Sequence, residues 1–317
     1  MRNILIATYP FGLCGDLPCQ LLEEEGYSVK YNSLGRRLKE NEVKRMLKNI
    51  DAVIAGTEPY NEETIKYANT LKVISRVGVG LDSIDYKVCL KKNIKVAYTP
   101  EAPADSVADL TVAQIFNLLR SIHISDKFVK EGRWKRILGE SVQNINIGIL
   151  GVGRIGSRVI NRLKNFGANI LACDINPNNN IEGIKWVDKE TLFENSDLIS
   201  IHIPLTKKNY HFIGLDELSS MKEGSYLINT SRGAVINEKD LESCVLNNHL
   251  AGVALDVFEK EPYDGVMKEL DNVILSAHIG ASDKRSRYLM ELGAVENCIE
   301  ILNGKIPKNI VTEKNFE

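Results

Sequence analysis

Three polar residues of reactive type follow short apolar runs in the second half of this 317-residue chain. Arg232 comes after "SYLIN", Glu261 lies in "DVFEKEP", and His278 ends "NVILSAH". A histidine exchanges a proton near neutral pH, a nearby carboxylate favours its charged form, and an arginine can hold a carboxylate through two hydrogen bonds. Together these groups could support hydride transfer between a nicotinamide cofactor and a 2-hydroxy acid.

Spacing alone leaves parts of this hypothesis open. Glu259 lies two residues from Glu261, so the sequence does not decide which carboxylate would orient His278. Asp256, inside the apolar run "ALDVF", needs a hydrogen-bonding partner, and the amide of a cofactor is one candidate. Histidines near strand ends are more often structural than catalytic, and three are interpreted in that way: His123, His211 and His249.

A glycine pattern predicts where a cofactor would bind. The apolar run "NIGIL" at 146–150 leads into GxGxxG at 151–156 and then into a helical pattern. Gly151 permits a tight turn, Gly153 lets a pyrophosphate approach the backbone, and Gly156 lets the helix pack closely on the strand. Asp174, 18 residues beyond Gly156 at the end of a second strand, can bind ribose hydroxyls and would repel the extra phosphate of NADP. We therefore expect NAD as the cofactor.

The elements that must position these residues form two series of short apolar runs with helical patterns between them. This rhythm is typical of βα units, so we expect an α/β protein with two doubly wound parallel-sheet (Rossmann-like) domains. A mostly helical region at 105–131 separates the two series, and the last helical pattern, 283–304, could cover either sheet. The expected strands are 3–7, 28–32, 52–56, 72–76 and 96–100, then 146–150, 169–173, 198–203, 225–229, 251–257 and 272–277.

The composition narrows the class of partner. Apolar residues make up 44% of the chain and charged residues 26%, as in ordinary globular proteins. Lys plus Arg number 40 against 42 Asp plus Glu, so we expect neither nucleic acid nor a membrane surface as partner. The six cysteines form no CxxC pair and no metal-ligand cluster, which favours reduced thiols and no metal. Without a signal-peptide or membrane-spanning pattern, a cytoplasmic protein that acts on a small molecule is expected.

Several longer motifs resemble one known family. They are "LGVGRIG" with Asp174, "HIPLT" (202–206), "LINTSRGAVINEKDL" (227–241), "AGVALDVFEKEP" (251–262) and "SAHIGA" (276–281), with "KVISRVGVGLDSID" (72–85) in the first series. In this order they resemble the D-isomer-specific 2-hydroxyacid dehydrogenases, nearest to the short D-3-phosphoglycerate dehydrogenase-like members. The resemblance spans nearly the whole chain.

The resemblance implies a role for each reactive residue. Arg232 would bind the substrate carboxylate and keto oxygen, His278 would be the general acid/base, and Glu261 would orient and charge His278. Backbone amides at Val79 and Gly80 would cradle the substrate carboxylate, as a glycine-rich loop can.

The resemblance also implies a cofactor site and a domain arrangement. Asp256 would meet the nicotinamide amide. The full set expected to bind NAD is Gly151, Gly153, Arg154, Ile155, Gly156, Asp174, His202, Pro204, Thr230, Ser231, Arg232, Asp256, His278 and Gly280. Residues 1–100 and 284–317 would form a substrate-binding domain, residues 101–283 an NAD-binding domain, and a cleft would lie between them. Family members are commonly homodimers joined through the NAD-binding domains.

The chain departs from the family pattern at three positions. Pro103 replaces a common asparagine, and Asp109 replaces a glutamate. Glu58 follows the third strand, where phosphoglycerate enzymes often place a phosphate-binding arginine, and would repel a phosphate; Arg76 could compensate. The D-2-hydroxy acid and its 2-keto acid could therefore be 3-phosphoglycerate and 3-phosphohydroxypyruvate, or the chain could be a hydroxypyruvate or glyoxylate reductase.

Two functions other than these dehydrogenase and reductase activities fit the sequence less well. The same fold serves as an NAD-sensing transcriptional co-regulator, but the chain has no long polar tail or peptide-docking extension. Hydride removal from formate usually goes with glutamine in place of the glutamate that pairs with the histidine, and Glu261 argues against it. The sequence favours the dehydrogenase.

Overall fold

The computed structural model describes residues 1–177 and 180–315, and the chain divides into two compact units. Unit 1 combines Met1–Pro103 with the C-terminal segment from Ala281, and unit 2 is Ala104–Gly280. The domain boundaries predicted from the sequence lie three residues away at each junction. Residues 316 and 317, the last two of the predicted substrate-binding domain, lie outside the described residues.

Unit 1 is built on a five-stranded parallel sheet with strand order β2-β1-β3-β4-β5. The strands in the middle of the sheet, β3 and β4, are fully buried because helices cover both faces; β3 is entirely apolar, whereas β4 ends in Ser75 and Arg76. The strands are β1 (Asn3–Ile6), β2 (Ser28–Tyr31), β3 (Ala52–Ala55), β4 (Val73–Arg76) and β5 (Lys95–Ala97). The helices are α1 (Leu17–Glu24), α2 (Glu40–Met46), α3 (Glu62–Ile65), α4 (Tyr86–Lys91), α11 (Lys284–Leu302) and the 3-10 turn η4 (Glu313–Asn315).

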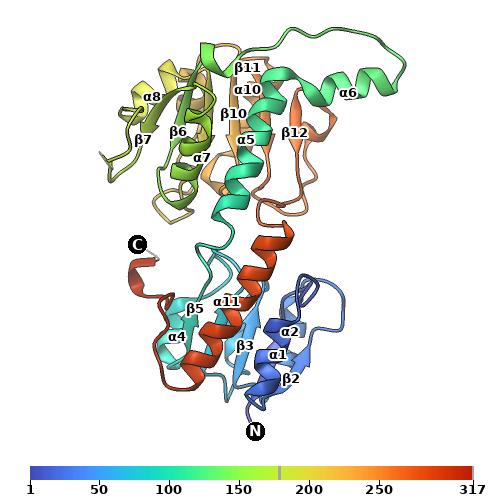
Figure 1. Cartoon of the computed structure of the whole chain (residues 1–317), viewed down its shortest axis with the longest axis vertical. Helices are drawn as coiled ribbons and strands as arrows, with labels where there is room; N and C mark the ends of the chain where they lie inside the picture. Colours follow the sequence, from blue (N-terminus) through green and yellow to red (C-terminus); the bar gives the residue numbers. More distant parts are fainter. Residues whose placement is uncertain (178–179, 316–317) are drawn as a thin grey trace. The chain divides into compact units, whose positions relative to one another are not determined.

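Helix α11 belongs to unit 1, a choice that its periodicity left open. It runs with α1 along one face of the five-stranded sheet (Figure 1), where Ala294, Val295 and Cys298 join the core. The Asp283 side chain caps it by accepting a hydrogen bond from the Ser286 N–H at 2.9 Å. Further along, Glu291 is 1% exposed and accepts from Arg287 Nε at 2.5 Å. Apolar contacts thus fix the helix to the sheet, and Glu291 also accepts from the Gly12 N–H of the loop after β1 at 2.9 Å.

Unit 2 contains a seven-stranded parallel sheet with strand order β12-β11-β10-β9-β6-β7-β8. Its strands are β6 (Asn146–Leu150), β7 (Asn169–Cys173), β8 (Lys185–Trp186), β9 (Leu198–Ile201), β10 (Ser225–Asn229), β11 (Leu250–Leu255) and β12 (Val273–Leu275). The predicted strands are confirmed within a few residues. Strand β8 is not predictable from the sequence, because two residues at a sheet edge carry no alternating or apolar pattern.

Helices cover both faces of this sheet as well. Helix α5 packs beside α7 on one face, and Figure 1 shows the pair in front of β6 and β10. The helices of unit 2 are α5 (Ala104–Arg120), α6 (Ile122–Lys130), α7 (Arg154–Lys164), α8 (Lys189–Asn195), α9 (Leu215–Ser220) and α10 (Glu238–Leu246), with 3-10 turns η1 (Val142–Asn144), η2 (Gly233–Val235) and η3 (Val266–Glu269). Within the described residues no helix combines the length and apolarity that crossing a bilayer would require.

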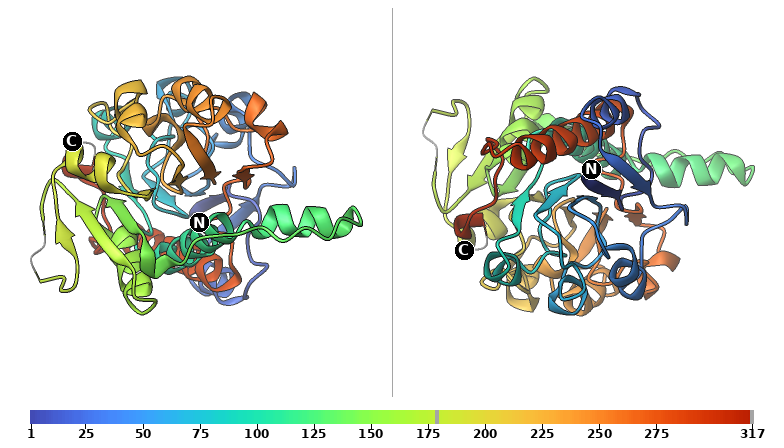
Figure 2. Two further views of the ribbon diagram at one scale, coloured as in Figure 1. Left: turned by 90° about the horizontal axis from the view of Figure 1, so that it is seen from above. Right: turned by 90° about the horizontal axis from the view of Figure 1, so that it is seen from below.

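The helical region predicted at 105–131 is broken in two. Ser121 has a left-handed backbone, with φ of 48°, and α6 leaves the sheet beyond it. Figures 1 and 2 both show α6 projecting from unit 2. Asp109, one of the family departures, lies on α5 and accepts a hydrogen bond from Arg162 Nε of α7 at 2.6 Å, so it helps to hold these two helices together.

Candidate active site

The glycine-rich turn between β6 and α7 has the shape that a dinucleotide requires. Gly151 has φ of +92°, and a Cβ there would lie 2.8 Å from the His202 backbone. A Cβ on Gly156 would lie 2.0 Å from the Gly151 oxygen, so the helix can approach the strand only without one. Gly153 caps α7, yet no atom of the described residues lies within 4 Å of its Cβ position. This open backbone at a helix N-terminus can receive a pyrophosphate.

Asp174 lies beside this turn, directly after β7. One carboxylate oxygen accepts from the Val152 N–H at 2.7 Å, and the other accepts from the Asn176 N–H at 2.8 Å. The carboxylate therefore fixes the glycine-rich loop from the next strand. An ionised oxygen pair at this strand end suits the hydroxyls of an NAD ribose and would repel an added phosphate.

His278 pairs with Glu261 through one ring nitrogen. Its Nδ1 lies 3.0 Å from both Glu261 carboxylate oxygens, and no described residue forms a hydrogen bond with Nε2. Burial alone would raise the pKa of Glu261, but the hydrogen bond and charge of His278, the Phe258 N–H and the charge of Arg232 outweigh it and lower that pKa. The pair consequently holds a carboxylate against one ring nitrogen and leaves the other accessible.

The turn that carries His278 is held by Asp256. His278 has φ of 53°, an unfavourable conformation for a residue with a Cβ. Buried Asp256, at the end of β11, accepts hydrogen bonds from the N–H groups of Ile279 and Gly280 at 2.8 Å and from the Ser276 hydroxyl at 2.6 Å. The protein itself thus provides the partners that the sequence analysis sought in a cofactor amide, and Ser276 is a contributor that no sequence pattern marked.

Arg232 follows β10 in a turn shaped by Asn229, a residue that the sequence analysis did not single out. The Asn229 side chain donates to the Arg232 carbonyl at 2.9 Å and accepts from the Ser231 N–H and O–H. An asparagine whose side-chain oxygen accepts from the N–H two residues later is typical of such a turn. The charge of Arg232 contributes to the lowered pKa of Glu261, so the two groups lie within electrostatic range.

Gly233 explains how this turn reaches the Glu261 segment. A Cβ on Gly233 would lie 1.9 Å from the Phe258 carbonyl carbon, so the two backbones touch at a position where only glycine fits. Gly233 therefore permits a close approach between its own backbone and the backbone of Phe258. Thr230, also predicted at the cofactor site, shares a 2.9 Å hydrogen bond with Thr111 of α5.

The remaining predicted cofactor residues lie around the same strand ends. His202 follows β9; its Nε2 bonds to Ser200 Oγ at 2.9 Å, and its buried Nδ1 has no partner among the described residues. Burial lowers the pKa of His202 to about 3, so the ring is neutral at pH 7. Pro204 and Arg154 are exposed, whereas the Ile155 side chain packs against the core, which leaves only its backbone toward the helix N-terminus.

Glu259 serves a different histidine. Its Oε1 lies 2.9 Å from His211 Nε2 and accepts from the Glu238 N–H at the start of α10. The choice between Glu259 and Glu261 is therefore resolved: Glu261 pairs with His278. His123 and His249 have structural hydrogen bonds, to Asn117 and the Asp271 carbonyl and to the Leu218 carbonyl respectively.

Val79 and Gly80 belong to unit 1, in the loop after β4. Val79 is 37% exposed. No described residue accepts a hydrogen bond from the N–H of either residue, whereas the neighbouring Val77 and Gly78 amides are both bonded within the unit. Two adjacent N–H groups without an acceptor among the described residues are able to receive an anion, as the sequence analysis predicts for this loop.

Comparison with known proteins gives consistent relationships. A family model described as "D-isomer specific 2-hydroxyacid dehydrogenase, NAD binding domain" matches residues 112–280. The glyoxylate reductase of Korarchaeum cryptofilum is 36% identical over 84% of each chain. The D-3-phosphoglycerate dehydrogenase of Methanocaldococcus jannaschii is 35% identical over 88% of this chain but 55% of its own. The structure of D-lactate dehydrogenase from Aquifex aeolicus, complexed with NAD and lactic acid, is 27% identical with a TM-score of 0.86, over 98% of this chain and 99% of that one.

Proposed function

Since the chain belongs to the D-isomer-specific 2-hydroxyacid dehydrogenase family, we propose that it reduces short, unphosphorylated 2-keto acids such as glyoxylate and hydroxypyruvate. As a member of this family it is an NAD-dependent oxidoreductase that acts on a CH–OH group. The observation that carries the proposal is the His278–Glu261 pair with its accessible Nε2. The glyoxylate reductase relative supports the choice of substrate, because it aligns over most of both chains.

In the proposed mechanism each residue has one task. Nε2 of protonated His278 donates to the keto oxygen, while Glu261 holds Nδ1 and favours the charged ring. Arg232 binds the substrate carboxylate and stabilises the negative charge that develops on the oxygen. Bound NADH supplies the hydride. The N–H groups of Val79 and Gly80 remain the predicted partners of the carboxylate in unit 1.

Residues of unit 2 are proposed to hold the cofactor. The open backbone at Gly153 and the N-terminus of α7 would bind the pyrophosphate, and Asp174 would bind the adenosine ribose. Neutral His202 and Thr230 would line the site. Asp256 would act on the nicotinamide side through the turn that it holds.

A substrate panel tests the proposal. Purified protein with NADH would be assayed against glyoxylate, hydroxypyruvate, pyruvate and 3-phosphohydroxypyruvate. We expect kcat/KM to be highest for an unphosphorylated acid. A preference for 3-phosphohydroxypyruvate would instead support the second candidate, a D-3-phosphoglycerate dehydrogenase, which is favoured by the 35% identity to the Methanocaldococcus enzyme.

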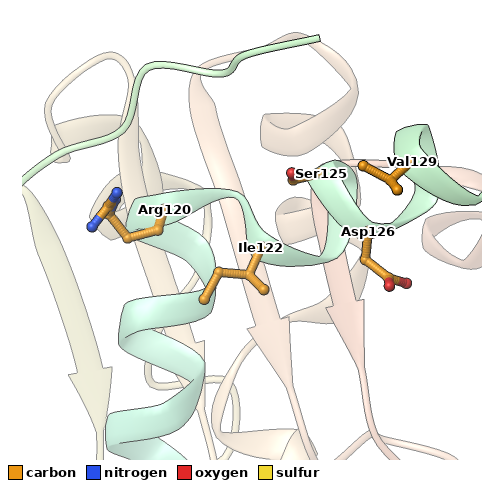
Figure 3. Close-up of a pocket in the computed structure, with 5 residues that line it drawn as sticks. All are labelled: Arg120, Ile122, Ser125, Asp126 and Val129. Atoms are coloured by element: carbon orange, nitrogen blue, oxygen red, sulfur yellow. The ribbon is translucent and has the colours of Figure 1, made fainter. Parts of the chain in front are cut away.

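We also propose a homodimer joined through unit 2. Helix α6 has no buried residue, and Trp134 and Leu138 in the segment after it are 85% and 99% exposed. Figure 3 shows the pocket of about 500 Å³ beside α6, where Ile122 and Val129 are each 53% exposed. Apolar surface on a projecting element is typical of an interface. Light scattering should give a dimer for the wild type and a monomer for Trp134→Asp/Leu138→Asp; an unchanged mass would exclude this surface.

The cytoplasm is the proposed location. All six cysteines are free thiols, with Cys89, Cys244 and Cys298 buried. Burial raises the pKa of Cys89 and of Cys298 to about 12, so these thiols stay protonated and unreactive. Unpaired cysteines in this number are typical of a reducing compartment.

A further inference from the structure

A buried polar cluster lies at the carboxyl end of β3 and β4 in unit 1. Ala55 of β3 pairs with Arg76 of β4, so the residues after Ala55 emerge beside Arg76. Three side chains of the cluster are almost fully buried: Glu58 (1% exposed), Tyr60 (0%) and Arg76 (8%). Glu58 Oε1 accepts from the Gly56 N–H at 2.6 Å and from the Tyr60 hydroxyl at 2.8 Å. Glu58, which the sequence analysis expects to repel a phosphate, is thus an interior group whose carboxylate is engaged within unit 1.

Arg76 fixes the loop that follows β4. Its Nε donates to the Gly80 carbonyl at 3.1 Å, and its Nη1 donates to the Val77 carbonyl. Gly78 has φ of +134°, and a Cβ on it would lie 3.1 Å from Nη1, so the loop wraps around the guanidinium. From the other side, Thr99 Oγ1 accepts from the Gly78 N–H at 2.8 Å and the Thr99 N–H donates to the Gly78 carbonyl at 3.0 Å.

This pattern accounts for the two unpaired amides. The carbonyl groups of Val77, Gly78 and Gly80 are all engaged by groups of unit 1. The N–H groups of Val79 and Gly80 are the ones without an acceptor among the described residues. Arg76 and Thr99 therefore determine which way the polar groups of this loop face.

The charges of the cluster are balanced internally. Burial, the charge of Glu58 and its hydrogen bond raise the pKa of Tyr60 well above its usual value, while the charge of Arg76 acts in the opposite direction. Tyr60 therefore stays protonated and donates to Glu58. The charges of Glu58 and Arg76 both act on Tyr60, so a buried anion and a buried cation lie within electrostatic range of the same side chain.

We propose that Arg76 is a positioning residue, which, balanced by Glu58, holds the Val77–Gly80 loop so that the N–H groups of Val79 and Gly80 bind the substrate carboxylate. This inference rests on the proposed function, since it assigns the carboxylate to that loop. The same arrangement explains why the substrate is unphosphorylated. The Arg76 guanidinium donates to backbone carbonyls of the Val77–Gly80 loop, so it is not directed at a substrate phosphate. The loop therefore recognises a carboxylate through its N–H groups.

The test compares Arg76→Lys with Arg45→Lys, a matched control on the exposed surface of α2. Lysine keeps the charge but loses the planar fork that reaches two carbonyls. We expect Arg76→Lys to raise the KM for glyoxylate and the inhibition constant of oxamate, a carboxylate analogue, by about tenfold. kcat should change less than about threefold, and the Kd for NADH should not change, because NADH binds unit 2. Arg45→Lys should match the wild type.

Thr99 provides a second test should Arg76→Lys fail to fold. Thr99→Val removes the oxygen that accepts from Gly78 and should raise the same two constants, whereas Thr99→Ser keeps the oxygen and should restore them. Unchanged constants in Arg76→Lys or Thr99→Val, or a fall in kcat alone, would overturn the inference while leaving the proposed function intact. If the wild type reduces no 2-keto acid with NADH, the proposed function itself is wrong.

Discussion

Unit 2 contains two histidine–glutamate pairs, His278–Glu261 and His211–Glu259, whose glutamates lie two residues apart. The pairs differ in what else each carboxylate binds besides the histidine ring. Both histidines have left-handed backbones, with φ of 53° at His278 and 49° at His211. Glu261 points both carboxylate oxygens at His278 Nδ1. Glu259 binds His211 Nε2 with an oxygen that also accepts the Glu238 N–H, and its own N–H donates to Glu238.

The difference shows that a His–Glu contact does not by itself make a proton-transfer site. At His211 the carboxylate caps α10, and the ring stacks on Tyr210 with centroids 4.0 Å apart, so this pair serves the fold. At His278 the second ring nitrogen stays accessible, and the nearby charge of Arg232 can hold an anion. Each histidine keeps one ring nitrogen without a hydrogen bond among the described residues, so the charge of Arg232 near Glu261 and the use of Glu259 at the start of α10 are what separate the proposed catalytic pair from the structural one.

Replacing His278 should give the largest effect. His278→Gln keeps a polar side chain but cannot transfer a proton, so kcat/KM for 2-keto acid reduction should fall about 10²- to 10⁴-fold. NADH titration by fluorescence should give a Kd close to that of the wild type, which serves as the folding control. Retention of more than about a tenth of the activity would remove His278 from the mechanism.

Replacing Glu261 should have a smaller effect on activity. Glu261→Gln keeps a hydrogen-bond acceptor for Nδ1 but removes the charge, and we expect a loss of about 10- to 100-fold in kcat. Because the folded state lowers the pKa of Glu261, its ionised form stabilises the protein above the usual glutamate pKa, and this stabilisation disappears as pH falls through the lowered value. Thermal unfolding of both proteins at pH 7 and pH 3 should show a larger wild-type advantage at pH 7 than at pH 3.

Replacing His211 should change stability without changing catalysis. Asparagine tolerates the left-handed backbone, so His211→Asn removes the bond to Glu259 with little added strain. Urea unfolding should show a loss of about 1 kcal/mol, and steady-state kinetics should stay within about twofold of the wild type. A large loss of kcat with normal stability would show that the second pair also acts in the reaction.

The smallest effect is expected when Glu238 is replaced, and here the replacement should stabilise the protein instead of destabilising it. Burial, and then the charges of Glu259 and Glu242, raise the pKa of Glu238 against the lowering effect of the Glu259 N–H. A raised pKa means that the ionised group destabilises the fold at neutral pH and that the cost disappears on acidification. Glu238→Gln should therefore raise Tm by about 1–2 °C at pH 7, with no gain near pH 4. A lower Tm at pH 7 would contradict this assignment.

The strands were predictable because their pattern is local. Buried parallel strands such as "NIGIL" and "NILAC" are continuous apolar runs, and helices cover both of their faces. The exceptions lack such a signal. Strand β8 has two residues, and the helix break at Ser121 involves neither glycine nor proline.

The sequence predicted the types of residue in the site but not which residues would be hydrogen-bonded to one another. Family motifs and strand ends pointed to Arg232 and His278, whereas the partner of His278 depended on how the 258–261 segment turns. Asp256 shows the same limit: its burial in an apolar run predicted a partner, but the backbone amides of Ile279 and Gly280 are supplied by the turn after β12. Hydrogen bonds between distant segments leave no periodic trace in the chain.

By itself, the sequence determined the parallel α/β architecture, the glycine turn for NAD and the residue types of the reaction, since periodicity, backbone freedom and side-chain chemistry are properties of local stretches. Tertiary structure alone decided that Glu261 and not Glu259 meets His278, that Glu58 lies inside unit 1, and that Arg76 faces backbone carbonyls. The physical reason is common to all three. The partner of a buried charged side chain depends on the donors and acceptors of neighbouring strands and loops, and these neighbours are distant in sequence.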